Sequence, residues 1–459
     1  MKILIVAHGF PPSGTGGAEI YAEAHARTLR RRFSDSVTIL ARENDRARPE
    51  YQVRDEWRED GLRIVWVNNT FRNSASFQDT YRNQTIGQLA CRLMDEMRPD
   101  VAHVHHLTCL STTIVESLAA RSIPCILTLH DYWMMCHRGQ LLDTNYRLCA
   151  GPRECSACIG PAAPAGRAAF LAGRALRTLE RMTAGEWTGI RRAAVAIGRA
   201  LPATRHDDRE SQARLQHMQD VCGMVARFLA PSRHLRDRFV AFGIPAERIT
   251  LAPYGFDHEP FACLERTRST QLRVGFLGSL MISKAPHVLL EAVERLPPGA
   301  VSVDLFGAVT AYHGDDGYRQ VLEPLLARVP ARVHGSLPHE SVAHALGTLD
   351  VLVVPSIWPE NSPLVIREAF LAGVPVLASR IGGIPEIVEH GRGGLLFRPG
   401  DSDDLAQRLT QLLEMPGLLD QLRATIPEVR TIEADVEETR ALYLECVSRR
   451  PTAAGARSA

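Results

Sequence analysis

The sequence predicts an α/β protein with two doubly wound, Rossmann-like domains that face each other across a cleft. First, apolar strand patterns alternate with helical patterns along nearly the whole chain, which is typical of parallel sheets covered by helices on both faces. Second, this alternation stops near Asp257 and restarts at Leu272. Third, 459 residues, 45% hydrophobic and 23% charged, are enough for two or three domains with their own cores.

The first domain is expected over residues 1–255. Strands are predicted at 2–7, 36–41, 62–67, 101–106 and 125–130, and helices at 18–32, 78–97 and 112–121. A further strand, turn and helix are expected around Ser232, and the segment 249–257 ends this unit.

One region, from about 132 to 224, interrupts the alternation and is interpreted as a cysteine-containing helical insertion into the first domain. It opens with four cysteines and continues as an Ala/Arg-rich segment with apolar residues at helical spacing. The stretches 166–182 and 189–201 are amphipathic and carry arginines. They fit either a helical pair that covers the first domain or a peripheral membrane contact that presents a lipid-linked acceptor.

The second domain is expected over residues 272–430. Its strands are predicted at 272–278, 301–307, 331–336, 350–356, 375–379 and 394–400, with helices that include 287–296 and 362–373. A C-terminal helix at 431–450 is long enough to pack across the domain boundary, and the tail 451–459 is expected to be disordered.

Composition and charge narrow the function classes. The formal net charge of +1 offers no electrostatic argument for a nucleic-acid partner. The N-terminal apolar run is too short for a signal peptide, and no run approaches the roughly 18 apolar residues of a spanning helix. We therefore expect a cytoplasmic protein, peripheral on the inner face of a membrane if the basic stretches bind one.

Glu360 and Glu368 lie on either side of a predicted helix start. A strand leads into a polar turn that holds Glu360 and Asn361, and Ser362 is the expected N-cap, with Pro363 at the first helical position. Glu368 then lies roughly 8 Å deeper, at the helical rise of about 1.5 Å per residue. Two carboxylates can bind hydroxyl groups, and the helix N-terminus between them attracts anions, so a sugar nucleotide fits this arrangement.

Two further segments suit phosphate. Gly16 and Gly17 form part of a glycine-rich turn between the first strand and a helix, which suits either phosphate binding or merely a tight turn. Lys284 follows the first strand of the second domain, and the only other lysine in an arginine-rich chain is Lys2. We therefore interpret Lys284 as a partner for a diphosphate and not as a solvated loop residue.

His130 ends a strand at the edge where ligands of such sheets bind. It could donate to a sugar hydroxyl or a phosphate, with Asp131 orienting it, or it could simply bond to backbone. Nearby His103, His105 and His106 weaken any argument from histidine alone. His105 and His106 would make only a weak metal-site candidate, because no carboxylate ligand is evident beside them.

Four cysteines, Cys136, Cys149, Cys155 and Cys158, form the pattern C-x12-C-x5-C-x2-C. We expect a structural zinc site, because the closing C-x2-C suits tetrahedral zinc and the intervening loop is hard to stabilise by a core alone. Disulfides or four unrelated thiols are the alternatives. A catalytic zinc is not expected, since four thiolates would leave no open coordination position.

These motifs, in this order, resemble the GT-B glycosyltransferases of family four, and the resemblance covers nearly the whole chain. The resemblance implies a retaining sugar transfer from a nucleotide-sugar donor to a glycan or lipid-linked acceptor in surface polysaccharide or glycoconjugate assembly, without a catalytic cofactor or metal. By that analogy Glu360 contacts the donor sugar with backbone groups of Asn361 and Ser362 nearby, and Glu368 holds the ribose. Lys284 and the Gly16-Gly17 turn would meet the diphosphate, and His130 would line the sugar or acceptor side.

One position departs from the family pattern. Ser279 stands where the family often has an arginine beside the lysine, so either Arg233 or Arg380 supplies that charge or the diphosphate is held less tightly. The acidic residues at 315–316 and 401–404 fit a loop and a helix cap better than a metal site. The nucleotide base is expected near 335–338. No side chain is plainly a nucleophile. This favours attack by the acceptor on the same face of the donor sugar from which the phosphate departs. A GT-B epimerase or phosphorylase, or a catalytically silent scaffold, are the alternatives.

Overall fold

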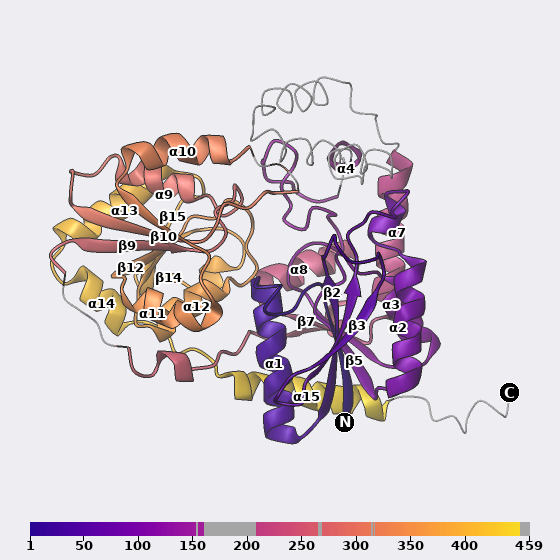
Figure 1. Ribbon diagram of the computed structural model, residues 1–459. Coiled ribbons are helices and arrows are strands. Elements are labelled where there is room, and N and C mark those ends of the chain that lie inside the picture. Colours follow the sequence, from indigo (N-terminus) through magenta and orange to yellow (C-terminus); the bar gives the residue numbers. More distant parts are fainter. Residues whose placement is uncertain (153–154, 160–207, 265–268, 314, 316, 450–459) are drawn as a thin grey trace, which may run out of the picture.

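The computed structural model describes residues 1–459 apart from 153–154, 160–207, 265–268, 314, 316 and 450–459. It contains two largely parallel sheets, each flanked by helices, which lie side by side in Figure 1. The strand orders are β3-β4-β2-β1-β5-β6-β7-β8 and β11-β10-β9-β12-β13-β15-β14. The predicted pair of doubly wound domains is therefore confirmed. The two basic stretches at 166–182 and 189–201 and the tail 451–459 lie outside the described residues.

The first sheet contains the predicted strands and two more, β3 and β8. Its members are β1 Lys2–Ala7, β2 Ser36–Glu43, β3 Val53–Trp57, β4 Arg63–Asn68, β5 Val101–Val104, β6 Cys125–Thr128, β7 Arg227–Ala230 and β8 Ile249–Leu251. The unpredicted strand β3 pairs antiparallel with β4 at the sheet edge. Its sequence VRDEW lacks an apolar pattern, because an edge strand held by backbone pairing needs little apolar surface.

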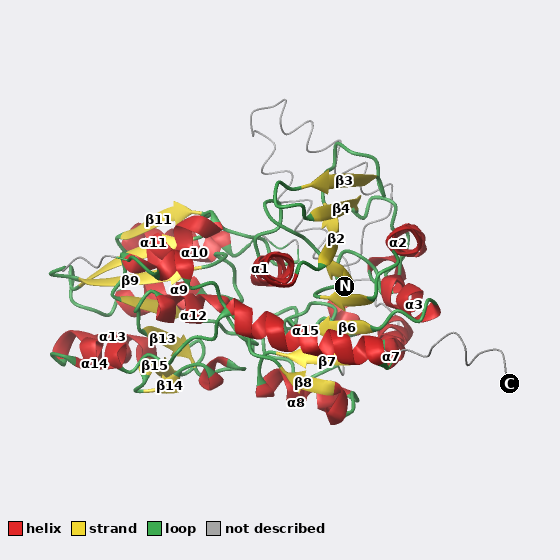
Figure 2. Ribbon diagram, turned by 90° about the horizontal axis from the view of Figure 1, so that it is seen from below, coloured by secondary structure: helices red, strands yellow, loops and turns green. Residues whose placement is uncertain are grey.

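The helices of the first half lie on both faces of this sheet (Figure 2). They are α1 Gly17–Phe33, η1 Gln78–Thr80, α2 Gln84–Met97, α3 Thr113–Ala120, α4 Ser156–Ile159, α7 Asp208–Met224, α8 Arg233–Phe242, η3 Ala246–Arg248 and η4 Glu259–Phe261. The helix predicted at 78–97 is present, but its predicted start was wrong. The α-helix begins only after Asn83, whose side chain accepts a hydrogen bond from the Ile86 N–H at 3.1 Å and so caps α2.

The second sheet contains the predicted strands and a short extra strand, β14. Its strands are β9 Leu272–Leu277, β10 Val301–Phe306, β11 Ala331–Gly335, β12 Val351–Val354, β13 Val376–Ser379, β14 Glu389–His390 and β15 Gly393–Phe397. Its helices are α9 Pro286–Val293, α10 Arg319–Arg328, η5 His339–Ser341, α11 Val342–Gly347, α12 Leu364–Leu371, η6 Ile384–Glu386, α13 Ser402–Glu414 and α14 Leu418–Ala424. Asp401 caps α13 through the Asp404 N–H at 2.8 Å, as predicted for this acidic segment.

The C-terminal helix α15, Ile432–Ser448, leaves the second domain and packs on the first (Figure 2). Its Asp435 accepts hydrogen bonds from the Tyr21 hydroxyl and the Gly255 N–H, both at 2.8 Å. Its Tyr443 hydroxyl lies 2.5 Å from Nδ1 of His103 on β5. Gly255 is required at this crossing, because a Cβ there would lie 2.3 Å from the Thr431 carbonyl oxygen.

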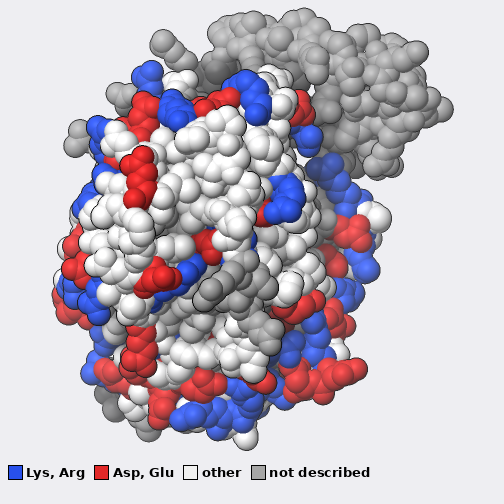
Figure 3. All heavy atoms as spheres, turned by 90° about the vertical axis from the view of Figure 1, so that its left-hand side faces the viewer, with Lys and Arg blue, Asp and Glu red and all other residues white. Residues whose placement is uncertain are grey.

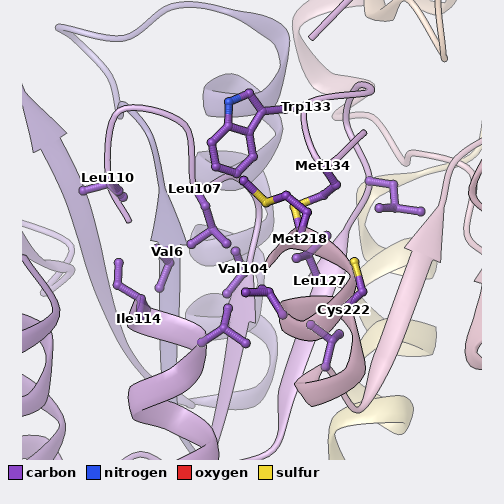
Figure 4. Close-up of a cluster of buried hydrophobic side chains, with 14 of the residues drawn as sticks. Val6, Val104, Leu107, Leu110, Ile114, Leu127, Trp133, Met134, Met218 and Cys222 are labelled. Atoms are coloured by element: carbon purple, nitrogen blue, oxygen red, sulfur yellow. The ribbon is translucent and has the colours of Figure 1, made fainter. Parts of the chain in front are cut away.

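The core of the first domain extends from the sheet into the insertion. Figure 4 shows side chains of β1, β5 and β6 packed with Trp133, Met134 and the α7 residues Met218 and Cys222, and Met218 is fully buried. On the face drawn in Figure 3, acidic and basic side chains are interspersed, in keeping with the near-zero net charge. Within the described residues, no helix combines the length and apolar character that crossing a bilayer requires.

Candidate functional site

A cleft of about 490 Å³ lies between the two domains, and both contribute to its walls. Strand-to-helix turns supply its polar groups, because the carboxyl ends of parallel strands meet there. The lining residues include every predicted site residue except the four cysteines: Gly16, Gly17, His130, Lys284, Glu360, Asn361, Ser362 and Glu368. The structure therefore brings together residues that are separated by up to 352 positions (from 16 to 368) in the sequence.

Lys284 and Glu360 form an ion pair in the second-domain wall. The Lys284 Nζ lies 2.5 Å from Oε1 of Glu360, which also accepts a hydrogen bond from the Ser356 hydroxyl at 2.7 Å. Glu360 is buried, whereas Lys284 is partly exposed and lies 5.5 Å from the centroid of the Trp358 ring. The ammonium group can thus turn towards an anion in the cleft while Ser356 continues to hold the carboxylate.

Glu368 lies in α12 at the bottom of this wall and is 7% exposed. Burial in an apolar environment raises the pKa of its carboxyl group to about 7. Near neutral pH the Glu368 side chain is therefore partly a protonated acid, which donates a hydrogen bond, and partly a carboxylate, which accepts hydrogen bonds. A ligand with vicinal hydroxyls would favour the ionised form.

The predicted N-cap of this helix was wrong. The helix begins at Leu364, Pro363 occupies the cap position in an extended conformation, and no side chain caps it. Ser362 instead accepts a hydrogen bond from the Arg367 guanidinium at 2.6 Å. A half-buried arginine one turn further on satisfies this hydroxyl, which local spacing alone did not reveal.

Asn361 joins the two domains. Its Nδ2 donates to the carbonyl oxygens of Leu129 and His130 at 3.1 and 3.3 Å, and its Oδ1 accepts from the Ser232 hydroxyl at 2.9 Å. The side chain is 3% exposed, so these bonds form away from water. Asn361 therefore positions the turn that carries Glu360 against the end of β6.

The Gly16-Gly17 turn is closely packed, and a side chain at either position would have to displace a neighbour. A Cβ at Gly16 would lie 2.6 Å from Oε2 of Glu19, and one at Gly17 would lie 3.3 Å from Leu364 of the other domain. Gly16 is also the N-cap of α1, so free N–H groups of the first turn face the cleft. The two domains approach each other closely at this point.

The His8–Glu19 ion pair was not predicted. His8 Nε2 lies 3.1 Å from Glu19 Oε1, and both residues line the cleft. Burial acts to raise the pKa of Glu19, but His8 outweighs it and the pKa falls to about 2. Burial likewise acts to lower the pKa of His8, but Glu19 raises it. His8 directly follows β1 at the ligand-binding edge, and that position was the available signal.

Asp131 does not orient His130, and that prediction was wrong. Asp131 Oδ2 lies 3.2 Å from Nε2 of His106, whereas His130 Nδ1 bonds to the Tyr254 hydroxyl at 2.6 Å and its Nε2 lies 3.2 Å from His105. Burial lowers the pKa of His130 to about 3, so its imidazole is neutral at pH 7. Both ring nitrogens of the neutral imidazole are already engaged, and His130 carries no charge for a phosphate.

The predicted weak metal candidate, His105 with His106, does not form, because His106 faces Asp131. His25, His103 and His105 instead bring ring nitrogens within 4.8 Å of one another in the core. Both nitrogens of His103 are occupied, by the Tyr443 hydroxyl at 2.5 Å and the Thr128 hydroxyl at 2.7 Å. Too few free nitrogens remain for a metal ion.

Ser279 lines the cleft, but Arg233 and Arg380 do not. Among the described residues, Lys284 is the one Lys or Arg side chain in the lining. The suggestion that either arginine replaces the family arginine therefore has no support in this arrangement. Ser336 and Leu337, within the segment expected to hold the base, do line the cleft.

Comparison with protein families finds two matches. The model described as Glycosyltransferase Family 4 matches residues 15–152, and that described as Glycosyl transferases group 1 matches residues 271–415. Sulfoquinovosyl transferase SQD2 of Arabidopsis thaliana is 31% identical over 199 residues, which are 40% of this chain and 37% of that protein. A D-inositol 3-phosphate glycosyltransferase of Nocardiopsis dassonvillei is 30% identical over 268 residues, 53% of this chain and 61% of that protein. The chain thus spans between about a third and two thirds of the length of these relatives.

Solved structures share the GT-B fold. Anabaena Alr3699/HepE, crystallised with UDP-glucose, has a TM-score of 0.61 and 17% identity over 98% of this chain and 99% of its own. Sucrose-phosphate synthase of Thermosynechococcus elongatus has a TM-score of 0.65 and 16% identity over 98% and 99%. At such low identity these likenesses establish the fold.

Proposed function

The chain belongs to glycosyltransferase family four, the glycosyl transferases of group 1, and we propose that it transfers a sugar from a nucleotide-sugar donor to a glycan or lipid-linked acceptor. The second domain would bind the donor, and the first would bind the acceptor. The transfer would retain the anomeric configuration and serve surface polysaccharide or glycoconjugate assembly.

One observation carries this proposal: Glu360, Lys284 and Glu368 lie in one wall of a cleft, and the glycine turn of α1 lies in the other. Glu360 would accept hydrogen bonds from the donor sugar hydroxyls, and Glu368 from the ribose. Lys284 would leave Glu360 for the diphosphate and stabilise the charge of the departing nucleotide. The free N–H groups of α1 would bind the same phosphates from the opposite side.

The acceptor would bind against the first domain, beside His130. The carboxylates on that side, Glu19 and Asp131, are each paired with an imidazole, from His8 and His106. Neither is an unengaged nucleophile, which supports attack on the face from which the nucleotide departs. The leaving phosphate would then take the acceptor proton.

The donor is proposed to be a UDP- or GDP-sugar. A UDP-sugar receives support from the structural neighbour crystallised with UDP-glucose. A catalytically silent sugar-nucleotide scaffold is the second candidate, because Ser279 replaces the family arginine and Lys284 is the one Lys or Arg of the described cleft lining.

Nucleotide release from a panel of UDP- and GDP-sugars tests both candidates. One donor should release nucleotide, and Glu360→Ala should slow that release by roughly 100-fold or more, as expected for a lost transition-state contact. Glu323→Ala, which alters an exposed carboxylate on α10, should behave as the native protein. Donor-induced thermal stabilisation without release would establish the scaffold. Release that Glu360→Ala leaves unchanged would refute the role of Glu360.

A further inference from the structure

The four cysteines of the insertion converge in the folded chain. Among the described residues they are all free and half-buried, and none forms a disulfide. Three short segments bring them together. The Cys149 N–H bonds to the Leu141 carbonyl at 2.8 Å, the Cys158 N–H to the Cys155 carbonyl at 3.0 Å, and His137 Nε2 to the Cys158 carbonyl at 2.9 Å. The Leu142 and Leu148 backbones also form an antiparallel bridge, which returns the chain to Cys149.

Cys136 begins a tight turn. The Gly139 N–H bonds to the Cys136 carbonyl oxygen at 2.8 Å. Gly139, at φ +75°, allows this tight turn, and a Cβ there would lie 2.9 Å from Asp131.

Two buried arginines flank the cluster without a carboxylate partner. Arg214 is 3% exposed and Arg138 is 6% exposed, and no described carboxylate lies within 4.0 Å of either guanidinium. Within the described part of the chain, the guanidinium groups of Arg214 and Arg138 donate to the backbone carbonyls of Trp133 and Leu142 and pack over aromatic rings. A buried cation needs a compensating anion nearby.

From this geometry we infer that Cys136, Cys149, Cys155 and Cys158 bind one structural zinc ion, with Arg138 and Arg214 as its countercharges. Four thiolates around Zn²⁺ leave an excess of two negative charges, which the two guanidinium groups balance. No three of the four sulfurs lie within 4.8 Å of one another. Metal binding therefore requires side-chain rotation, foremost at Cys149, whose sulfur now donates to the Gly151 carbonyl at 2.9 Å.

The zinc-bound loop would connect the two domains. The Tyr146 hydroxyl donates to Asp315 at 2.5 Å, and His313 Nε2 lies 2.9 Å from the Arg138 carbonyl oxygen. The Arg138 guanidinium also lies 4.9 Å from the centroid of the Tyr312 ring. Asp315, Tyr312 and His313 belong to the loop after β10 in the second domain. Zinc would thus fix the shape of a segment that contacts both domains.

Metal analysis of the full chain, purified without chelators, tests the inference. We expect one zinc per chain, and a thiolate-to-metal charge-transfer band with tetrahedral ligand-field bands after exchange for Co²⁺. Cys136→Ser and Cys155→Ser should lose the metal. Two matched controls, Cys263→Ser at an exposed free cysteine and His25→Gln in the histidine cluster, should keep it.

A second measurement uses the native chain alone and does not depend on the folding of variants. Trypsin should cleave after the exposed Arg147 faster in the chelator-treated protein than in the zinc-reloaded protein. Absence of zinc after reloading would overturn the inference, as would a Co²⁺ spectrum without the charge-transfer band. Zinc that both serine variants retain and His25→Gln loses would also overturn it. So would a mass that reveals a disulfide among the four cysteines in the freshly purified protein.

Discussion

Replacing Glu368 by Gln should stabilise the ligand-free protein at pH 8 and change its stability little at pH 5. Burial raises the pKa of this carboxyl group from 4.5 to about 7 in the folded chain. Between these values the folded state binds the proton more tightly than the unfolded state, so stability falls as pH rises through this window. Above pH 7 the whole cost of the buried charge is present, and Gln removes it without a change in shape.

The shift of about 2.5 pKa units corresponds to roughly 3 kcal/mol at pH 8, at 1.36 kcal/mol per unit. At pH 5 the same relation gives under about 1 kcal/mol. For a domain of this size, roughly 3 kcal/mol shifts the melting temperature by about 6–12 °C.

Calorimetry of both proteins from pH 5 to pH 8.5 measures this difference. Glu323→Gln on the exposed face of α10 is the control, and its difference from the native protein should not depend on pH. Binding of UDP or GDP should behave oppositely: affinity should rise between pH 6 and 8 in the native protein and be weaker in Glu368→Gln. A melting difference that stays constant with pH would refute the burial argument, whereas flat nucleotide binding would refute only the proposed ribose contact.

Two further substitutions test the cleft. Gly16→Ala should weaken nucleotide binding by about tenfold or more, because its Cβ would displace the Glu19 carboxylate 2.6 Å away. Gly223→Ala, where nothing lies within 4 Å of the added Cβ, is the control. Equal nucleotide titration curves for Gly16→Ala and the native protein would contradict this prediction. Asn361→Ala should destabilise the chain by about 2–3 kcal/mol, because it leaves buried partners unpaired. A denaturation cycle with Ser232→Ala should give a coupling of about 1 kcal/mol, and additive effects would exclude the interdomain bond.

The sequence predicted the fold and the edge at which the site lies. Strand and helix periodicities depend on which side chains are buried, and burial is a local property that the order of apolar residues encodes. The carboxyl ends of parallel strands must meet at one edge, so residues such as Lys284, Glu360 and Gly16 could be assigned to one cleft without coordinates. The edge strand β3 was not predicted, because its backbone pairing with β4 stabilises it and its sequence has no apolar pattern.

The pairing of the polar groups depends on how the folded segments pack. Asp131 bonds to His106 and not to its neighbour His130, and Asn361 bonds across the domain boundary. Partner choice depends on distances between segments far apart in the chain, and hydrogen bonds and ion pairs act over only a few ångströms. The order of the amino acids thus predicts two α/β domains and the polar residues of their cleft. The packing of those domains determined the pKa of Glu368, the Lys284–Glu360 pair and the buried arginines beside the cysteines.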